Sequence, residues 1–442
     1  MQLQSSNLWR VRILVGVLLV FASIPVAMAL RPQSDADFDH GIIAYSKTAP
    51  TDPIARLQRQ VDSGEITLKY EQSLGYLPAI LRALNVPVSS QSLVFSKTSF
   101  QFTQIAPARP RALYFNDDVY VGYVQGSRTL EFAASDPKLG AVFYTLEEDE
   151  NERPKFQREV YFCLICHDNS SITGGVPGFM TLSVLPDKEG NAIRSAPANA
   201  MSDQTPFSER WGGWYVTGTH GTQRHRGNTL LPPGALSMLS RRDWSPGANV
   251  TKLDDKIDTD SYLTPHSDIV ALIALTHQTR IHNLITRANY DTLRAIQDEG
   301  SVNGSVTAER IRNAVEPLVR GMFFVSEAPL TDSVRGDSGF AADFEKNGVR
   351  DKKGRSLKDL DLKRRFLRYP LSYLIYSEAF DALPGAAKDY FYERARKILS
   401  GADPDFGHLT AEDRAAILEI LNDTKPEFGR VEPVVRRPGV SG

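Results

Sequence analysis

The sequence contains very little cysteine: two residues, Cys163 and Cys166, in a chain of 442. So small a number excludes a disulfide framework of the kind that stabilises small secreted domains. The chain also lacks an excess of basic residues, since 51 Lys and Arg face 53 Asp and Glu. A protein that binds nucleic acid by neutralising phosphates needs such an excess, so no nucleic-acid partner is expected. Internal repeats and low-complexity tracts are absent as well, and 41% hydrophobic residues are enough for a large folded core.

The first 29 residues have the pattern of an export signal. An uncharged, mostly apolar run extends from Ile13 to Leu30; it is at the short end for a membrane span and contains a proline. Arg10 and Arg12 precede the run, and Ala27-Met28-Ala29 matches the small-x-small cleavage pattern. Adjacent twin arginines and a lipid-bearing cysteine are missing. We therefore expect a Sec signal peptide at 1–29 and a mature protein that is periplasmic or secreted, without a stable membrane span; the alternative is that the segment is kept as an uncleaved membrane anchor.

Both cysteines belong to one motif, Cys163-Leu164-Ile165-Cys166-His167. In C-x-x-C-H the two thiols can add to the two vinyl groups of a haem as thioethers, and the adjacent imidazole supplies a nitrogen ligand to the iron. We therefore predict one covalently bound haem c, attached at Cys163 and Cys166, with His167 as the proximal iron ligand.

Three other interpretations of the motif are weaker. A thioredoxin-like redox pair needs a βαβ context, whereas the segment 168–175 that follows His167 is rich in turn-forming residues. A zinc site needs further cysteines or closely spaced histidines, and no other cysteine is present. A disulfide within the motif closes a very small loop and contributes little stability.

The second axial ligand of the iron is left open by the sequence. Residues 168–260 are rich in Gly and Pro and form the predicted haem-binding loops. The candidates for the distal position are His220 and His225, ranked first, followed by Met180 and Met201. A methionine raises the reduction potential, a second histidine lowers it, and a vacant position permits chemistry on peroxide or a small gas.

Four further residues are weighed as haem contacts. Arg210 is a candidate partner for a haem propionate and Trp214 for the macrocycle, although a cation beside two packed indoles is the commoner arrangement. His277 and His282 lie five positions apart on the best predicted helix, from Ile269 to about Ile296. Five helical positions turn by about 140°, so these two rings face different ways and polar contacts within a packed helix are the favoured interpretation.

The predicted fold class is α+β, with a β-rich N-terminal part, a loop-rich haem-binding middle and an all-helical C-terminal part. These regions are placed at 30–150, 151–260 and 261–430, followed by a loose tail at 431–442. Strand patterns predict a hairpin at 112–124 and further strands at 129–133 and 141–146. Helical patterns are seen at 78–84, 370–383, 386–399 and from Thr410 onward. The basic run from Lys346 to Arg365 is interpreted as a solvated face, with docking of an acidic redox partner as the alternative.

The attachment motif is similar to that of c-type cytochromes. Segments 113–122, 209–221 and 368–376 further resemble a group of secreted bacterial proteins that contain a cytochrome c domain. The resemblance implies haem at Cys163, Cys166 and His167. A β-rich stretch precedes the motif where small cytochromes c have a helix, so the fold of those proteins is not expected here.

Two functions follow from these observations. The favoured one is an exported monohaem c-type cytochrome that passes electrons to or from a periplasmic redox partner protein, since electron transfer is the commonest task of such haem. The alternative is a peroxidase-like oxidoreductase or a sensor, with an open distal site that acts on peroxide or a small gas. No catalytic residue is identified for that alternative.

Overall fold

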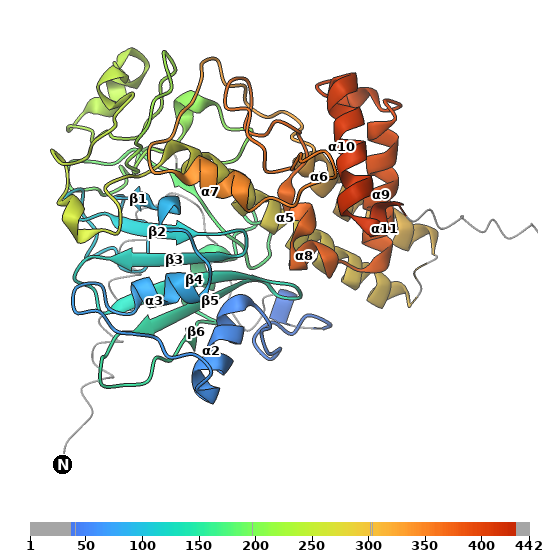
Figure 1. Ribbon diagram of the computed structural model, residues 1–442, viewed down its shortest axis with the longest axis horizontal. Helices are drawn as coiled ribbons and strands as arrows, with labels where there is room; N and C mark the ends of the chain where they lie inside the picture. Colours follow the sequence, from blue (N-terminus) through green and yellow to red (C-terminus); the bar gives the residue numbers. More distant parts are fainter. Residues whose placement is uncertain (1–36, 40, 197, 301, 303, 430–442) are drawn as a thin grey trace, which may run out of the picture.

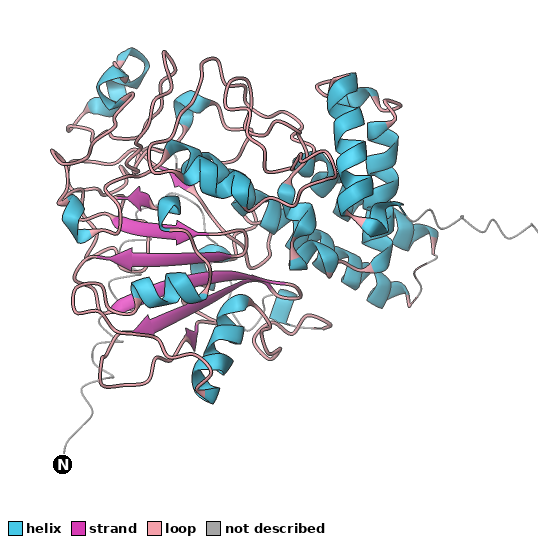
Figure 2. Ribbon diagram, viewed as in Figure 1, coloured by secondary structure: helices cyan, strands magenta, loops and turns pink. Residues whose placement is uncertain are grey.

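The computed structural model describes residues 37–39, 41–196, 198–300, 302 and 304–429 (Figure 1). The predicted signal peptide at 1–29 and the tail at 431–442 lie outside these residues. The α+β class is confirmed: an antiparallel sheet forms one end of the molecule, and helices of the C-terminal part form the other (Figures 1 and 2).

The sheet is a meander in which each strand pairs with the next one along the chain. Its strands are β1 (Ser92–Val94), β2 (Arg111–Phe115), β3 (Val119–Val124), β4 (Thr129–Asp136), β5 (Gly140–Glu147) and β6 (Gln157–Arg158). The predicted hairpin is confirmed as β2 and β3, with Phe115 opposite Tyr120. Its turn is closed by the side chain of Asn116, whose Oδ1 accepts hydrogen bonds from the amides of Asp118 and Val119. The turn therefore has a local cause, a short side chain that captures the backbone two residues on.

Helices cover both faces of the sheet. On one face Tyr120 points to α5 (Ile269–Glu299), where its hydroxyl accepts a hydrogen bond from Gln278 Nε2 at 2.9 Å. On the other face Tyr144 donates to Asp52 Oδ2 at 2.5 Å, and Asp52 is the N-cap of α2 (Pro53–Ser63). Because both faces are covered, all six residues of β3 are buried.

The remaining helices and strands are mostly short or belong to the C-terminal part. They are α3 (Leu77–Ala83), α4 (Leu164–His167), β7 (Leu182–Ser183), β8 (Asn199–Ala200), α6 (Ser305–Met322), α7 (Phe340–Lys346), α8 (Glu378–Asp381), α9 (Gly385–Leu399), α10 (Ala411–Thr424) and α11 (Pro426–Gly429). The predicted helices corresponding to α3, α5, α9 and α10 are confirmed. Helices α2 and α6 were not predicted from the sequence.

The predicted helix at 370–383 is wrong. The chain forms only a 3-10 turn at Tyr373–Tyr376 and the short helix α8. Ser372 and Ser377 each accept a backbone N–H through their hydroxyl oxygens, at Leu374 and Phe380 respectively. Serine caps of this kind start a new helix at each site, so the apolar spacing of the segment is not realised as one continuous helix.

One hydrophobic core extends from Phe38 to Phe428 and includes residues of all three predicted regions. The middle region contributes mainly loops and short elements, as the Gly and Pro pattern predicted. Among the residues described, no helix is both long and apolar enough to cross a membrane.

Candidate functional site

The C-x-x-C-H motif forms a single helical turn. Cys163 is the N-cap of α4, and its carbonyl oxygen accepts hydrogen bonds from the amides of Cys166 at 3.2 Å and His167 at 2.9 Å. Both cysteines are unpaired and partly exposed. Residues three positions apart lie on the same side of a helix, so the two thiols are presented together, as attachment to a single planar group requires.

The chain turns away directly after the motif. Asn169 Oδ1 accepts hydrogen bonds from the amides of Ser171 at 2.9 Å and Ile172 at 3.2 Å, and Thr173 Oγ1 donates to the Asn169 carbonyl at 3.0 Å. This side-chain turn ends α4 at His167. It agrees with the turn-rich composition of the segment and leaves no βαβ unit of the kind a thioredoxin-like pair needs.

The imidazole of His167 is oriented by one backbone contact. Its Nδ1 lies 2.8 Å from the carbonyl oxygen of Gly178, and the Gly178 amide donates to the His167 carbonyl at 3.0 Å. A carbonyl oxygen can only accept, so Nδ1 carries the proton and Nε2 carries the lone pair. Within the part of the chain that the structure describes, no hydrogen bond is made to Nε2. Burial lowers the pKa of His167 to about 4, so the ring is neutral at pH 7, the form that binds metals.

The segment that orients His167 is attached to helix α5. Asn283 accepts a hydrogen bond from the amide of Phe179 and donates one to the carbonyl of Phe179, both at 2.8 Å. A Cβ on Gly178 would lie 2.5 Å from Asn283 Oδ1, so only glycine fits between the loop and the helix. On the other side, the ring of Phe143 on β5 lies 4.5 Å from the His167 ring. The sheet and α5 together therefore hold the imidazole.

A buried ion pair lies beside the motif and was missed by the sequence analysis. Arg111 on β2 and Glu131 on β4 pair across β3, with Nη2 to Oε2 at 2.5 Å and both side chains largely buried. The guanidinium crosses Gly122, where a Cβ would lie 2.5 Å from Nη2. The charge of Arg111 acts on both Cys163 and His167. The sequence could have indicated this ion pair, because Arg111, Gly122 and Glu131 lie on three consecutive strands that are otherwise mostly apolar.

The thiols do not have the character of a redox-active pair. Burial raises the pKa of Cys166 to about 12 and raises that of Cys163 further, with the nearby carboxylates of Glu131 and Glu159 adding to the effect at Cys163. Reactive cysteines have lowered pKa values instead. In the apoprotein both sulfurs are therefore protonated at pH 7.

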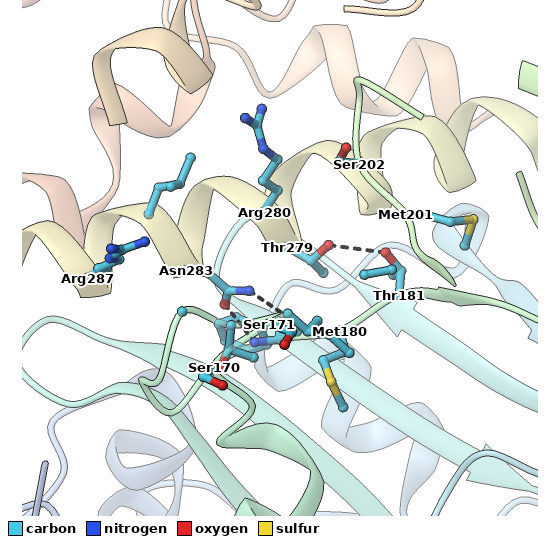
Figure 3. Close-up of a pocket in the computed structure, with 16 residues that line it drawn as sticks. Ser170, Ser171, Met180, Thr181, Met201, Ser202, Thr279, Arg280, Asn283 and Arg287 are labelled. Atoms are coloured by element: carbon cyan, nitrogen blue, oxygen red, sulfur yellow. Dashed lines mark hydrogen bonds between the residues drawn. The ribbon is translucent and has the colours of Figure 1, made fainter. Parts of the chain in front are cut away.

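A cavity of about 270 Å³ lies next to the motif, between the loop that follows His167 and helix α5 (Figure 3). Residues 170–174 form one wall, and Arg280, Asn283 and Arg287 of α5 contribute another. Two of the four distal candidates, Met180 and Met201, line it, whereas Cys163, Cys166 and His167 do not. The Met201 sulfur accepts a hydrogen bond from the amide of Trp211 at 3.0 Å.

The other two distal candidates lie in a separate buried cluster. The rings of His220 and His225 are 4.7 Å apart, and both contact Phe207. In the described part of the chain, no hydrogen bond or ring contact joins either one to His167. The amide of Asn249 donates to His220 Nε2 at 2.9 Å, and the amide of Gly227 donates to His225 Nδ1 at 3.0 Å.

The remaining candidates donate to backbone carbonyls. Arg210 is 3% exposed, and its guanidinium donates to the carbonyls of Thr205 and Asp203. Trp214 Nε1 donates to the Leu182 carbonyl at 2.8 Å. In this arrangement both side chains tie the middle-region loops together.

The two histidines on α5 make the polar contacts expected of a packed helix. His277 Nε2 is 2.9 Å from Ser372 Oγ, and His282 Nε2 is 2.8 Å from the Asp117 carbonyl oxygen. They face different partners, as the spacing of five residues predicted.

The basic run at 346–365 is largely neutralised by carboxylates of the same chain. Seven of its nine cations form ion pairs: Arg350, Lys352, Lys353, Arg355, Lys358, Arg364 and Arg365. A solvated, internally paired face accounts for this run.

The residues of the motif fit a covalently attached haem. Two reduced thiols on one side of a helical turn are the groups that form thioethers, and a neutral imidazole with an unengaged Nε2 is the group that ligates iron. Among the described residues, no group of three or more His, Cys, Asp or Glu side chains is arranged to hold another metal ion. Comparison with models of known families, with curated proteins and with solved structures found no match for this chain.

Proposed function

We propose that this chain is an exported monohaem c-type cytochrome that carries electrons through a haem attached at Cys163 and Cys166. The observation that carries the proposal is the orientation of His167: its Nδ1–H faces the Gly178 carbonyl, among the described residues no hydrogen bond is made to its Nε2, and the same helical turn carries two reduced thiols. When bound, the haem supplies a one-electron Fe(III)/Fe(II) couple.

The chain's own residues have three tasks in this proposal. The Gly178 carbonyl fixes the tautomer of His167 and raises its basicity as a ligand. Phe143 excludes water from one side of that ring. Arg111 offers a buried Nε–H that has no partner among the described residues, although its Nη2 is paired with Glu131. A guanidinium with such a spare donor is suited to a haem propionate.

For the distal position we favour Met180. Backbone amides already donate to His220 Nε2 and to His225 Nδ1, so the other ring nitrogens carry protons and have no lone pair for iron. Met201 accepts the Trp211 amide through its sulfur. Met180 lines the cavity beside the helical turn formed by residues 163–167, which we call the attachment turn, and its side chain is partly exposed.

A redox partner protein is proposed to approach at the attachment turn. Tyr161 and Phe162 directly precede Cys163 and are 54% and 40% exposed. Exposed aromatic side chains of this kind are enriched at protein interfaces. The basic run at 346–365 is a poorer candidate because most of its charges are already paired within the chain.

Production of the full chain in a bacterium with a periplasmic c-type haem maturation system tests the proposal. We expect haem that stays with the polypeptide after denaturation, measured by absorbance and by intact mass. Cys163→Ser and Cys166→Ser should each leave only one thioether, and the double variant none, while the matched variant Ile165→Val in the same turn should keep both. A soluble wild-type protein without covalent haem would refute the proposal.

The alternative function gives a different optical spectrum. A low-spin reduced spectrum that carbon monoxide leaves unchanged means six-coordinate iron and supports the electron carrier. A high-spin spectrum that shifts with carbon monoxide means a vacant distal position, and the peroxidase-like or gas-sensing function then replaces the carrier.

A further inference from the structure

Three N–H donors without acceptors lie in one buried aromatic cluster, away from the haem attachment turn. The cluster consists of Trp211, His220 and His225 around Phe207, with the His220 and His225 rings 4.7 Å apart and the Trp211 and His225 rings 5.4 Å apart. All three nitrogen-bearing side chains are at most 1% exposed. Trp211 Nε1, His220 Nδ1 and His225 Nε2 have no hydrogen-bond partner among the described residues.

The backbone determines which ring nitrogens carry protons. Asn249 N–H points at His220 Nε2, and Gly227 N–H points at His225 Nδ1. A nitrogen that accepts an N–H holds the lone pair, so in a neutral ring the proton sits on the other nitrogen. Burial lowers the pKa of both histidines, that of His225 to about 3, so both rings are neutral at pH 7. The unpartnered atoms of both imidazoles are therefore donors, and the indole Nε1 can only donate.

Three unpaired donors in one cluster constrain what can occupy it. A buried donor without an acceptor is destabilising, so binding of an acceptor is strongly favoured. A metal cation needs lone pairs, which these nitrogens do not offer. A single water molecule accepts about two hydrogen bonds, fewer than the three donors present, and it also brings two hydrogens that need acceptors of their own. An anion can accept hydrogen bonds from all three donors, and it brings no hydrogen that would itself need an acceptor.

The charges near the cluster agree with an anion. Arg224 exerts a positive potential on both His220 and His225. The Asp332 carboxylate acts on His220 in the opposite direction and more weakly. The backbone carbonyls of Gln223 and of His220 itself also favour the charged form of the His220 ring, but neither is a hydrogen-bond partner of its Nδ1.

We propose that His220 Nδ1, His225 Nε2 and Trp211 Nε1 together bind one small monovalent anion of the size of a halide. The inference stands independently of the proposed function, because it uses no residue of the attachment turn. Met201 separates this anion site from the cavity beside that turn, since its sulfur accepts the Trp211 amide while its side chain lines the cavity.

Bromide is the probe for the first experiment. Crystals of the full mature protein are grown in sodium bromide, and diffraction is measured at the bromine absorption edge. We expect one ordered anomalous peak within hydrogen-bond distance of the three nitrogens. The proposal is overturned if bromide appears elsewhere in the crystal while the cluster holds only water or nothing.

Solution measurements separate the anion site from a general salt effect. The thermal midpoint is followed in sodium bromide and in sodium sulfate at equal ionic strength. His225→Phe should lower the apparent affinity for bromide, derived from these thermal midpoints, about tenfold or more. His277→Phe is the control: His277 is equally buried but lies outside the cluster, and this variant should keep the wild-type affinity. Equal responses in both variants would contradict the proposal.

A third measurement needs no variant that might fail to fold. Nitrogen-15 spectra of the wild-type histidines report the tautomers directly. We expect the proton on Nδ1 of His220 and on Nε2 of His225, and the opposite tautomers would rule out a donor-only site.

Discussion

Asn283 on α5 holds Phe179 by both of its backbone polar groups, accepting from its amide and donating to its carbonyl at 2.8 Å. Phe179 follows Gly178, whose carbonyl orients His167. A helix more than one hundred residues further along the chain thus determines how the imidazole that we propose as the iron ligand is presented.

Replacing Asn283 should destabilise the protein markedly. Asn283→Ala leaves the Phe179 amide and carbonyl buried without partners, and we expect a loss of about 2–4 kcal/mol in the free energy of unfolding. Denaturant unfolding measures this loss. Asn289→Ala on the same helix is the control, because the one hydrogen bond that its side chain makes among the described residues, to the Lys138 carbonyl, is long at 3.4 Å. Similar losses in the two variants would show that the two hydrogen bonds between Asn283 and Phe179 have no special role in stability.

The Arg111 and Glu131 pair should behave as a buried ion pair. Each single variant, Arg111→Met or Glu131→Gln, leaves a largely buried partner without its counter-ion, and we expect each to cost about 3 kcal/mol of unfolding free energy. The double variant should cost less than the sum of the two, which a double-mutant cycle measures. In the exposed pair Arg56–Glu378, Arg56→Met should cost less than about 1 kcal/mol. Additive effects at Arg111 and Glu131 would mean that the two charges do not interact.

The distal ligand can be identified from spectra of the haem-loaded protein. Met180→Ala should convert a low-spin spectrum to one that responds to carbon monoxide, because it removes the sulfur that we assign to the sixth position. Met201→Ala in the same cavity is the matched control and should leave the coordination unchanged. If Met201→Ala alone changes the spectrum, the assignment moves to that residue.

Glu148 should make stability depend on pH. Its Oε1 accepts the Tyr76 amide at 2.7 Å, and burial raises the pKa of its carboxyl from 4.5 to about 7. The folded state therefore favours the protonated form, and this contribution to stability, complete below pH 4.5, is lost as the pH rises through 7. The side chain introduced by Glu148→Gln stays neutral and keeps an acceptor for the Tyr76 amide. As the pH rises from 5 to 8, the stability of this variant relative to the wild type should therefore increase. Unfolding midpoints at both pH values test this, with the exposed Glu150→Gln as a control; a difference that is constant with pH would refute it.

Several elements were predictable because their causes are local. The hairpin turn depends on Asn116, which accepts the amides of Asp118 and Val119, and α5 begins where Asp268 accepts the amides of Val270 and Ala271. The attachment turn is likewise determined by five consecutive residues. The segment 370–383 was mispredicted because its apolar spacing suits a helix, while two serine caps divide it.

By itself the sequence determined the chemistry of the candidate site: two thiols and an imidazole at the spacing that haem attachment uses, on a chain with no other cysteine. Only the tertiary structure decided the state of those groups. The carbonyl that orients His167, the Arg111 and Glu131 pair across Gly122, and the Asn249 amide that places the proton on His220 all come from contacts between residues far apart in the sequence or on different strands. The direction of a hydrogen bond depends on which groups come into contact in the folded protein, and the spacing of residues along the chain does not predict those contacts.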